Sequence, residues 1–545
     1  MAPRHQVVLA DKLCSLTGTE IRSSSVDLSI VDAPFNPEVF YSGSKNQWEL
    51  PERLNEYENW VREKGSPRLI KFLEYLKEHN PKVYAYHLIQ AIELLATYRL
   101  LSMEGSLILH CDPILTLAAS IEIGKGIFGE ACFQKNITWA RGSQHSDAKG
   151  LARDHECLLH FTKHPKDYIL NQPRIPLKND QRFSLDDNDG KGPYRLESVL
   201  ASRSLSGGGY SQELDGHRFN LKMPPAKVSE LRAAGEFLIT SKGVPKRKKY
   251  QSEAAEDKPL TDVWTDISIL GMPKSERMPF RTQKPEKLYQ RLLEMHSNPG
   301  SLVLDSNGGS GTTAVVAEKL GRYSITIEKD VTSFQMSLDR LQKTDPGCKQ
   351  RITIRVIPDD LEAAIYLRKL DTVGYGAGQI PATRQYEQWR TQTCAEKYSR
   401  WIPSSKPFDG HVSFVDNRGC CKSIVLEAKS QTLTPGEFRN ARQKAERDRR
   451  VGVIFLVPED VSKTIRNEAL QLEPYIYRDN QGNQLEIPAV QIITDEQYFQ
   501  GIRPILPPCL LKDGMFLSTP IFQSPACTQA PDDEDSSFKL LFASA

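Results

Sequence analysis

The stretch Leu302–Thr313 decides the fold of this chain, and it consists of Leu-Val-Leu-Asp-Ser-Asn-Gly-Gly-Ser-Gly-Thr-Thr. A short apolar run ends at Asp305, passes through three glycines and enters Thr312–Leu320, whose apolar residues recur at helical spacing before Gly321. This pattern predicts a strand, a tight loop and a helix. Glycines in such a loop let the backbone approach a ligand closely, and the start of the helix offers unpaired N–H groups.

A second buried strand, Ser324–Ile327, is expected next, with Glu328 at its carboxyl end. An acid about 20 residues beyond a glycine loop suits the two hydroxyls of a ribose. Because Gly309, Gly311 and Ala314 also satisfy the dinucleotide fingerprint, the loop alone leaves a nicotinamide enzyme open. A structural strand–loop–helix corner without any ligand is equally compatible with it.

Length and composition set broad limits. With 545 residues the chain is long enough for two or three domains with buried cores. The net charge of +2 does not announce nucleic acid, so a basic surface would have to be local. Ten scattered cysteines without C-x-x-C pairs, no apolar signal core and no membrane-spanning run predict a reduced, cytoplasmic protein.

Strands near the amino terminus also end in acids. Gln6–Ala10 is a predicted strand followed by Asp11, and Val26–Val31 is followed by Asp32-Ala33-Pro34-Phe35. An acid, a proline and an aromatic ring at a strand end occupy the place where open α/β sheets bind ligands. By itself, however, this sequence is also typical of a simple turn.

The next segment predicts further sheet and helix. Tyr84–Met103 has helical spacing, and Gly105 is expected to open a turn into a buried strand that carries His110 and ends at Asp112. A lone histidine there is more often a satisfied hydrogen-bonding residue than a ligand, so His110 receives no chemical role. Further strands are expected at residues 137–139 and 157–161.

From about residue 166 to 260 low hydrophobicity and glycine-rich or acidic runs predict loops and small irregular elements rather than sheet core. Within this region a basic run beside Tyr250 is a candidate DNA contact through the phosphates. Its candidate DNA-binding residues are Lys246, Arg247, Lys248 and Lys249. A solvated charged face is the alternative interpretation.

Taken together, these motifs resemble the β-class amino-methyltransferases of DNA, which use S-adenosylmethionine to modify adenine N6 or cytosine N4. In that family the catalytic motif precedes the glycine-rich cofactor motif, with a target-recognition region between them. Asp32–Phe35 resembles the catalytic D/S/N-P-P-F/Y motif, Thr282–Pro285 matches T-Q-K-P, and Asp305–Thr313 resembles D-P-F-x-G-S-G-T-T. The resemblance implies an α/β, Rossmann-like and circularly permuted methyltransferase sheet with an irregular insertion.

The resemblance also implies roles for single residues. An amine conjugated with its ring is a poor nucleophile, so the site must accept its N–H protons and orient it. Asp32 and the carbonyl of Ala33 would do this beside Pro34, and Phe35 would stack on a base flipped out of double-stranded DNA. The residues expected to bind S-adenosylmethionine are Asp11, Asp305, Gly309, Gly311, Thr312, Thr313 and Glu328.

The chain departs from the family pattern at several positions. Ala33 replaces the first proline of the catalytic motif, Ser306 and Asn307 replace the usual Pro-Phe, and Ala140 replaces a lysine common after the tryptophan. A second hypothesis is therefore a weakened or inactive methyltransferase fold that only binds DNA. An acid at position 32 favours adenine over cytosine, because related cytosine enzymes often carry serine there.

The carboxyl-terminal part predicts alternating helices and strands, with a helix start specified by Thr434, Pro435 and Glu437. It resembles the restriction-endonuclease-like fold found fused to related methyltransferases, with its P-D…(D/E)-x-K motif. Asp409 and Glu427 would bind Mg²⁺, and Lys429 would position water. A DNA-binding or nuclease domain, and with it a bifunctional restriction-modification protein, is therefore a further hypothesis, whereas Glu387 is expected to be a solvated helix acid.

The predicted organisation has five parts. Residues 1–165 form the catalytic half of the methyltransferase and 281–370 its cofactor half, with the target-recognition region at 166–280. A smaller α/β endonuclease-like domain at 380–505 and a flexible tail at 506–545 follow. The predicted partner is double-stranded DNA.

Overall fold

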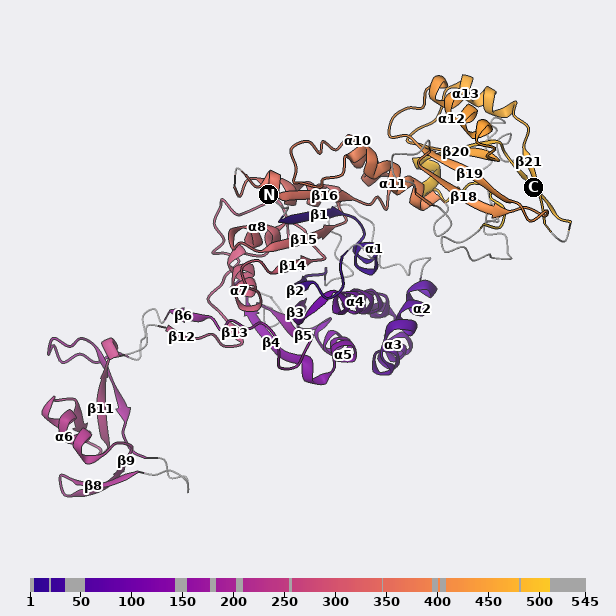
Figure 1. Cartoon of the computed structure of the whole chain (residues 1–545). Coiled ribbons are helices and arrows are strands. Elements are labelled where there is room, and N and C mark those ends of the chain that lie inside the picture. The colour runs from indigo at the N-terminus through magenta and orange to yellow at the C-terminus, as the bar shows by residue number, and fades with distance from the viewer. Residues whose placement is uncertain are drawn as a thin grey trace, which may run out of the picture. The chain divides into compact units, whose positions relative to one another are not determined.

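The computed structural model describes residues 4–18, 21–34, 54–142, 154–176, 183–201, 209–253, 257–345, 347–394, 400–401, 408–479 and 482–509. The chain divides into two compact units, one made of residues 172–261 and the other of the sequence on both sides of them (Figure 1). Among the described helices, none is long and apolar enough to cross a membrane. The tail predicted for 506–545 starts too early, because Leu506 and Cys509 are buried in the core of the carboxyl-terminal sheet. The rest of that segment, beyond Cys509, lies outside the described residues.

The larger unit is built on a nine-stranded mixed sheet. Neighbouring strands from β3 to β16 run parallel, whereas β5 runs antiparallel to both its neighbours. The strand order is β13 (Val263–Trp264), β4 (Phe133–Ala140), β5 (His155–Thr162), β3 (Leu101–Cys111), β2 (Val26–Val31), β14 (Leu302–Asp305), β15 (Tyr323–Glu328), β1 (His5–Leu9) and β16 (Ile352–Val356).

The central pairing joins the two halves of the sequence. Strand β14 pairs with β2, so that Val303 lies opposite Leu28 and Asp305 lies opposite Ile30. The loops that follow these two strands therefore leave the same edge of the sheet. This pairing brings the expected catalytic and cofactor motifs together.

Helices cover both faces of the sheet (Figure 1). Side chains of β1 alternate between them: Val8 packs in the core of α1 to α5, whereas Val7 and Leu9 pack against α8, α9 and α10. The helices are α1 (Lys12–Thr17), α2 (Leu54–Lys64), α3 (Pro67–His79), α4 (Pro81–Leu100), α5 (Leu117–Phe128), α7 (Glu286–His296), α8 (Thr312–Lys319), α9 (Val331–Gln342) and α10 (Leu361–Lys369).

The sequence prediction at Gly105 is wrong. The expected turn at Gly105 is absent, because β3 continues from Leu101 through this glycine without a break. A Cβ atom on Gly105 would lie 2.8 Å from the carbonyl oxygen of Val26, and the register of β2 and β3 shifts next to that contact. Glycine is therefore needed for close approach of the strands at a bulge rather than for a turn.

The smaller unit contains more regular structure than its composition predicts. It has its own small core, in which Val199, Leu221, Val228, Leu231 and Phe237 are buried. A three-stranded sheet of β10 (Phe237–Ile239), β11 (Pro245–Tyr250) and β7 (Tyr194–Ser198) is accompanied by helix α6 (Pro225–Ala233). The remaining strands pair as β8 (Tyr210–Leu214) with β9 (His217–Leu221) and β6 (Arg174–Pro176) with β12 (Asp257–Pro259).

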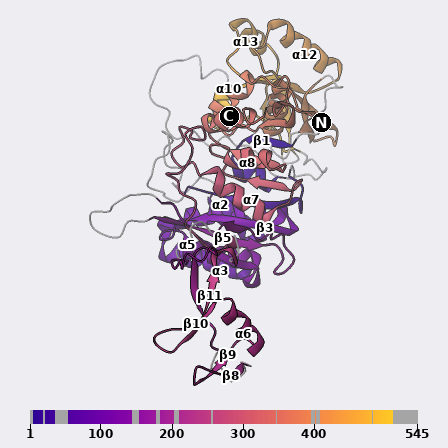
Figure 2. The same cartoon turned by 90° about the vertical axis from the view of Figure 1, so that its left-hand side faces the viewer.

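The carboxyl-terminal region adds a five-stranded sheet to the larger unit. Its order is β17 (Arg400–Trp401), β18 (Gly410–Val415), β19 (Cys421–Ala428), β20 (Gly452–Val457) and β23 (Val490–Thr494). Helix α12 (Pro435–Arg447) begins with the predicted capping box and lies beside α13 (Lys463–Leu470) (Figure 2). The other elements are α11 (Ala382–Cys394), α14 (Asp495–Phe499) and the hairpin of β21 (Tyr475–Arg478) and β22 (Gln484–Ile487).

Helix α11 attaches this region to the edge of the large sheet. The side-chain amide of Gln385 accepts from the backbone N–H of Val356 at 2.9 Å and donates to the carbonyl of Ile354 at 3.1 Å. Tyr386 and Trp389 are buried in the same core as β1 and α10. Because side chains satisfy the edge of β16, the sheet ends there without an open edge at these positions.

Candidate active site

Acidic residues gather where parallel strands end. Asp32 follows β2, Asp305 ends β14, Glu328 ends β15, and Asp11 comes directly after Ala10 beyond β1. Since these strands are neighbours and run parallel, the acids share one edge of the sheet, where open α/β folds bind ligands. A cavity of about 870 Å³ opens at this edge, and all of these acids line it.

The glycine loop is held by the acid that precedes it. The backbone N–H of Asn307 donates to Asp305 Oδ1 at 3.0 Å, and the hydroxyl of Thr313 donates to Asp305 Oδ2. Burial, more than any other influence, raises the pKa of Asp305 to about 7. The expected cofactor residues Gly309 and Thr312 line the cavity, whereas Gly311 and Thr313 shape the loop beneath it.

Two glycine positions show why the loop has this sequence. Gly311 adopts a left-handed conformation with φ 75° at the start of α8, and an added Cβ would lie 2.3 Å from Oγ of Ser337. The N–H of Gly309 donates to Glu328 Oε2 at 2.7 Å, which ties the loop to the end of β15. Burial raises the pKa of Glu328. The loop thus keeps its backbone close to two buried carboxylates.

A buried ionic network surrounds Asp32. The ammonium of Lys284 lies 2.8 Å from Asp32 Oδ2 and 3.5 Å from Glu156 Oε2. The imidazole of His110 lies between the same carboxylates, at 3.4 Å from Asp32 and 2.7 Å from Glu156. Arg141 contributes a further cation 3.3 Å from Glu156. The catalytic candidate is therefore fixed by a network of alternating charges.

Electrostatics of this network favour charged side chains. Burial would raise the pKa of Glu156, but the cation of Lys284 and then His110 hold it far below its usual range. Burial would likewise lower the pKa of Lys284, but Asp32 and Glu156 outweigh it and raise that pKa. A buried charge that is paired in this way costs much less than an isolated one.

Sequence reasoning missed part of this network. His110 was expected to be an ordinary hydrogen-bonding residue, and Glu156 was not singled out at all. Lys284 was expected only as part of the T-Q-K-P motif, without a role of its own. The available signal was that His110 and Glu156 both stand at the catalytic end of buried strands, β3 and β5, that pair side by side.

The remaining predicted residues of this site divide into two groups. Ala33 and Pro34 line the cavity beside Asp32, whereas Phe35 lies outside the described residues. Asp11 lines the cavity and also caps α1, because its side chain accepts from the backbone N–H of Leu13 at 2.9 Å. The cap fixes Asp11 at the rim of the site.

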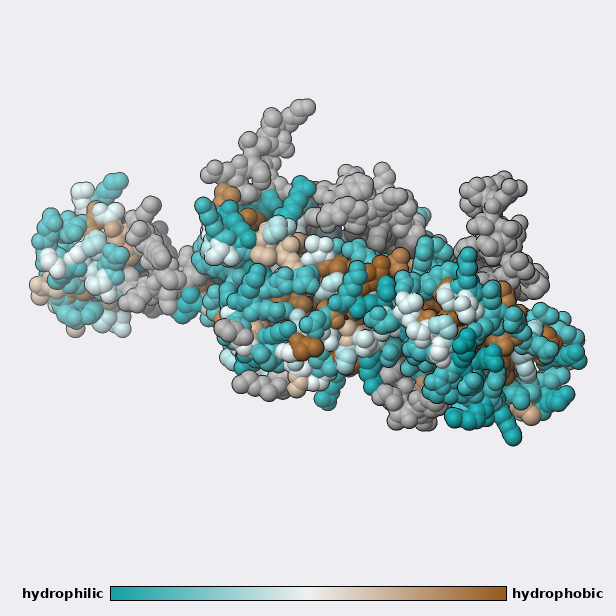
Figure 3. All heavy atoms as spheres, turned by 90° about the horizontal axis from the view of Figure 1, so that it is seen from above, coloured by the Kyte–Doolittle hydropathy of each residue, from teal (hydrophilic) through white to brown (hydrophobic). Residues whose placement is uncertain are grey.

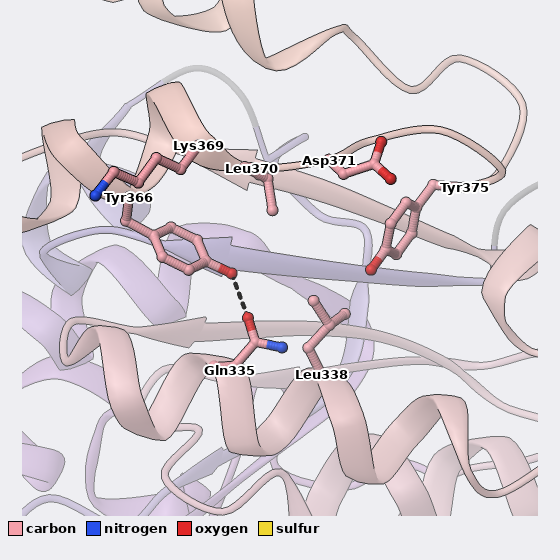
Figure 4. A pocket seen from close by; sticks show the side chains of 7 residues that line it. All are labelled: Gln335, Leu338, Tyr366, Lys369, Leu370, Asp371 and Tyr375. Atoms are coloured by element: carbon pink, nitrogen blue, oxygen red, sulfur yellow. Dashed lines mark hydrogen bonds between the residues drawn. The ribbon is translucent and has the colours of Figure 1, made fainter.

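A smaller hollow of about 230 Å³ lies between α9, α10 and the loop after α10 (Figure 4). Tyr366 and Tyr375 both border it, and the hydroxyl of Tyr366 donates to Oε1 of Gln335 at 2.5 Å. Its described lining contains no residue of the sequence motifs. The larger cavity is therefore the candidate active site.

The basic strand of the smaller unit is partly neutralised. Arg247 and Lys249 lie 3.3 Å and 3.6 Å from Glu197 on the neighbouring strand β7, and Lys248 lies 2.5 Å from Asp187. Within the described part of the chain, Lys246 has no such acidic partner at ion-pair distance. The candidate DNA-contacting residues therefore differ in how much of their charge remains available.

Acidic side chains also gather in the carboxyl-terminal sheet. Glu427 and Lys429 lie on one face at the end of β19, with Lys429 Nζ 2.8 Å from Glu427 Oε1, as strand alternation predicts. Asp409, just before β18, accepts from the backbone N–H of Ala428 at 2.8 Å. Burial raises the pKa values of both Asp409 and Glu427.

The expectation for Glu387 is wrong. This residue is a half-buried member of the acidic group rather than a solvated helix acid. Burial, followed by the nearby carboxylate of Asp409, raises the pKa of Glu387 to about 7. Over the described ranges no three acidic, histidine or cysteine side chains stand close enough together to hold a metal ion. A metal would have to draw these carboxylates inward.

Helix α12 and the residues after it also carry several arginines, which could contact phosphate but are largely paired with acids. On α12, Arg439 lies 2.5 Å from Glu468 and Arg442 lies 3.0 Å from Glu446. Arg449 and Arg450 follow the end of this helix. The part of the molecule that carries α12 and α13 presents a predominantly hydrophilic surface (Figure 3), but much of its positive charge is balanced locally.

Known proteins resemble the part of the chain that forms this site. Type II methyltransferase M.EcaI of Enterobacter cloacae is 27% identical over 221 residues, 39% of this chain and 48% of that protein. The StyLTI Mod subunit of a type III restriction-modification enzyme from Salmonella typhimurium is 26% identical over 212 residues, 34% of this chain and 31% of that protein. The chain thus spans at most about half the length of these two curated relatives.

A solved structure also matches. The crystal structure of the M1.HpyAVI–SAM complex aligns with 62% of this chain and 98% of that chain, at 16% identity and a TM-score of 0.33. A family model described as DNA methylase matches residues 26–338, which include Asp32, the Thr282–Pro285 motif and the glycine loop. Since this match covers more than half of the sequence, the chain belongs to the N6/N4 DNA methylase family.

Proposed function

We propose that this protein transfers a methyl group from S-adenosylmethionine to an exocyclic amine of a base in double-stranded DNA, with adenine N6 favoured over cytosine N4. One observation carries the proposal: the carboxylate of Asp32 and the loop from Asp305 to Thr313 line or support a single cavity. Family membership supports the same chemistry.

The cavity fits the cofactor in size and in donor chemistry. Its volume of about 870 Å³ suits a ligand of this size. S-adenosylmethionine would supply an activated methyl group on a sulfonium. Asp305 and the loop N–H groups would hold its amino-acid end, Glu328 its ribose hydroxyls, and Asp11 its adenine.

Asp32 and the carbonyl of Ala33 would accept the two N–H groups of the target amine. Accepting these protons leaves the lone pair of the amine to face the methyl group, which is the orientation the reaction needs. Lys284 and His110 hold the Asp32 carboxylate through the contacts described above. The residues of the chain thus position an amine instead of generating a strong base.

Preference for adenine rests on the acid at position 32. The catalytic position of related cytosine enzymes often carries serine, whereas adenine enzymes usually carry aspartate. Double-stranded DNA would be met in part by the basic strand β11, and Lys246 is the cation of that strand with the least neutralised charge. Phosphate contacts of this kind would make binding strongly dependent on salt.

Transfer of tritium from labelled S-adenosylmethionine to duplex DNA tests the proposal. Asp32→Ala should abolish incorporation and leave cofactor binding intact, because in the proposed arrangement Asp32 would contact the base and the glycine loop would hold the cofactor. Equal incorporation by wild type and Asp32→Ala would contradict the catalytic role assigned to Asp32. Cofactor titration by calorimetry separates the alternative, a DNA-binding protein with an inactive fold, which would bind DNA without binding cofactor.

We further infer a restriction-endonuclease-like domain in the carboxyl-terminal region, which favours a bifunctional restriction-modification protein as the second candidate function. The observation behind it is that Asp409, Glu427 and Lys429 lie close enough to Glu387 for their charges to act on its pKa. Carboxylates are hard oxygen ligands suited to Mg²⁺, and a lysine beside them suits the positioning of water.

Incubation of the full chain with supercoiled plasmid and Mg²⁺ tests this second function. Nicking that requires Mg²⁺ and disappears in both Glu427→Ala and Lys429→Ala is the expected result. Asp32→Ala serves as the matched control, since it should cut normally while failing to methylate. Absence of Mg²⁺-dependent nicking would contradict the nuclease function.

A further inference from the structure

A buried carboxylate lies directly behind the cofactor loop. Glu93 belongs to the middle of α4, is only 1% exposed and lines the candidate active-site cavity. Neither the catalytic nor the cofactor motif contains it. A fully buried acid outside the reacting groups requires an explanation, because an isolated charge in such a place is strongly unfavourable.

Three donors from two segments of the chain satisfy this carboxylate. The hydroxyl of Ser306 donates to Glu93 Oε1 at 2.6 Å, and the side-chain amide of Asn307 donates to the same oxygen at 2.9 Å. The ammonium of Lys12 donates to Glu93 Oε2 at 2.6 Å. Lys12 also donates to the amide oxygen of Asn307 at 2.9 Å, so the contacts form a closed ring.

This ring of contacts lies at the turn that precedes the glycine loop. Ser306 and Asn307 form the turn between Asp305, where β14 ends, and the glycines of the loop. They stand where the family motif carries a proline and an aromatic residue. Neither of those residues has a side-chain donor, and proline also lacks a backbone N–H. The sequence Ser-Asn is therefore chemically matched to a buried acid behind the turn.

We propose that Glu93 is the positioning residue of the cofactor loop, and that Glu93, Lys12, Ser306 and Asn307 form one interdependent set. This inference rests on the proposed function. It means that Ser306 and Asn307 do not weaken cofactor binding, because Glu93 compensates for the absence of the family's Pro-Phe. The carboxylate pins the turn through two hydrogen bonds, and Lys12 balances its charge. Asp305 and the loop N–H groups are thereby held in place for the cofactor.

The first test compares two buried acids of the full chain by calorimetric titration with S-adenosylmethionine. Glu93→Gln should weaken cofactor binding at least tenfold, because its amide N–H₂ would face the ammonium of Lys12. The matched control is Glu58→Gln: Glu58 is 7% exposed and accepts from Lys77 at 2.6 Å and Tyr84 at 2.9 Å, away from the cavity. It should lower the melting temperature and leave the cofactor Kd unchanged.

Kinetics separate positioning from a general structural role. Glu93→Gln should raise KM for S-adenosylmethionine and leave kcat at saturating cofactor within about threefold of wild type, since Asp32 and its network are untouched. A variant that merely loosened the fold would lower kcat or the active fraction without such a split.

The decisive test is the dependence of one change on the other. Replacing Ser306 and Asn307 by Pro and Phe should weaken cofactor binding at least tenfold, because Glu93 keeps only Lys12 as a partner. Adding Glu93→Leu to that double variant should restore Kd to within about threefold of wild type, although Glu93→Leu alone weakens binding. If the effects of the Ser306/Asn307 replacement and of Glu93→Leu on Kd are independent and simply multiply, the proposal is overturned. Absence of cofactor binding by the wild type would instead overturn the proposed function itself.

Discussion

The ammonium nitrogen of Lys284 lies 2.8 Å from Oδ2 and 3.1 Å from Oδ1 of Asp32, although 252 positions separate the two residues in the sequence. Lys284 is also 3.5 Å from Glu156, so one ammonium contacts two partly buried carboxylates. This relationship places the T-Q-K-P segment beside the catalytic candidate and makes Lys284 a positioning residue of the proposed reaction.

Lys284→Met should lower kcat about 100-fold. The change removes the ammonium that Asp32 and Glu156 share, and removing one partner of a buried ion pair costs about 3–5 kcal/mol of unfolding free energy. Lys284→Arg should retain more activity than Lys284→Met, because it keeps the charge. Steady-state methylation and thermal unfolding measure both effects, and full activity of Lys284→Met would contradict the assigned role.

Cofactor affinity should rise with pH through neutrality. The pKa of Asp305 is raised to about 7 by burial, so below pH 7 the free protein holds a proton on this carboxyl. Since the carboxylate is the form that would accept from the cofactor ammonium, binding must release that proton at low pH, and Kd should decrease from pH 6 to 8. Calorimetry in buffers of different ionisation enthalpy measures the release. Asp305→Asn should bind weakly at every pH and show no such trend.

Gly311→Ala should destabilise the fold and weaken cofactor binding, because its φ of 75° and the 2.3 Å approach of an added Cβ to Ser337 Oγ both oppose a side chain. Gly321→Ala is the matched control: its φ is 71°, but an added Cβ meets nothing within 4 Å. In Gly321→Ala the free energy of unfolding should fall by only about 1–2 kcal/mol, which is the backbone cost of a side chain in the left-handed region. Denaturant unfolding of both variants measures the extra loss of stability caused by the contact with Ser337. Equal losses in the two variants would show that this contact contributes nothing.

Lys246→Ala should reduce the dependence of DNA binding on salt. Each phosphate contact that is lost lowers the slope of log K against log[salt] by about 0.9. Lys248→Ala should change the slope less, because Asp187 lies 2.5 Å from the Lys248 ammonium. Fluorescence anisotropy over a salt series compares them, and the opposite ranking would show that the pairing with Asp187 is broken on DNA.

Binding of Mg²⁺ by the carboxyl-terminal acidic group should weaken as pH falls from 8 to 6. Burial raises the pKa of Glu387 to about 7, so this carboxyl gains a proton within that range and becomes a poorer ligand. Metal titration of the full chain at several pH values measures the effect. In Glu387→Gln the pH dependence in this range should disappear, and an unchanged dependence would assign it to another group.

Local sequence determined much of the fold. The apolar run, glycines and helical spacing at 302–320 predicted β14, the loop and α8 with correct boundaries to within a residue, because each depends on neighbours along the chain. The same holds for Val26–Val31 and for the capping box at Thr434. Gly105 shows the limit: a glycine signals an unusual backbone requirement, but only the partner strand shows that the requirement is close approach.

Only the tertiary structure decided which side chains meet. The strand order places the end of β2 beside the end of β14, and from that follow the contacts of Lys284, His110 and Glu156 around Asp32. In the sequence, nothing distinguishes Glu93 from other polar residues of a helix. Only the fold shows its contacts with Ser306 and Asn307. Periodicity reports which face of an element is buried, whereas the partner of a buried charge is chosen by packing between segments hundreds of residues apart.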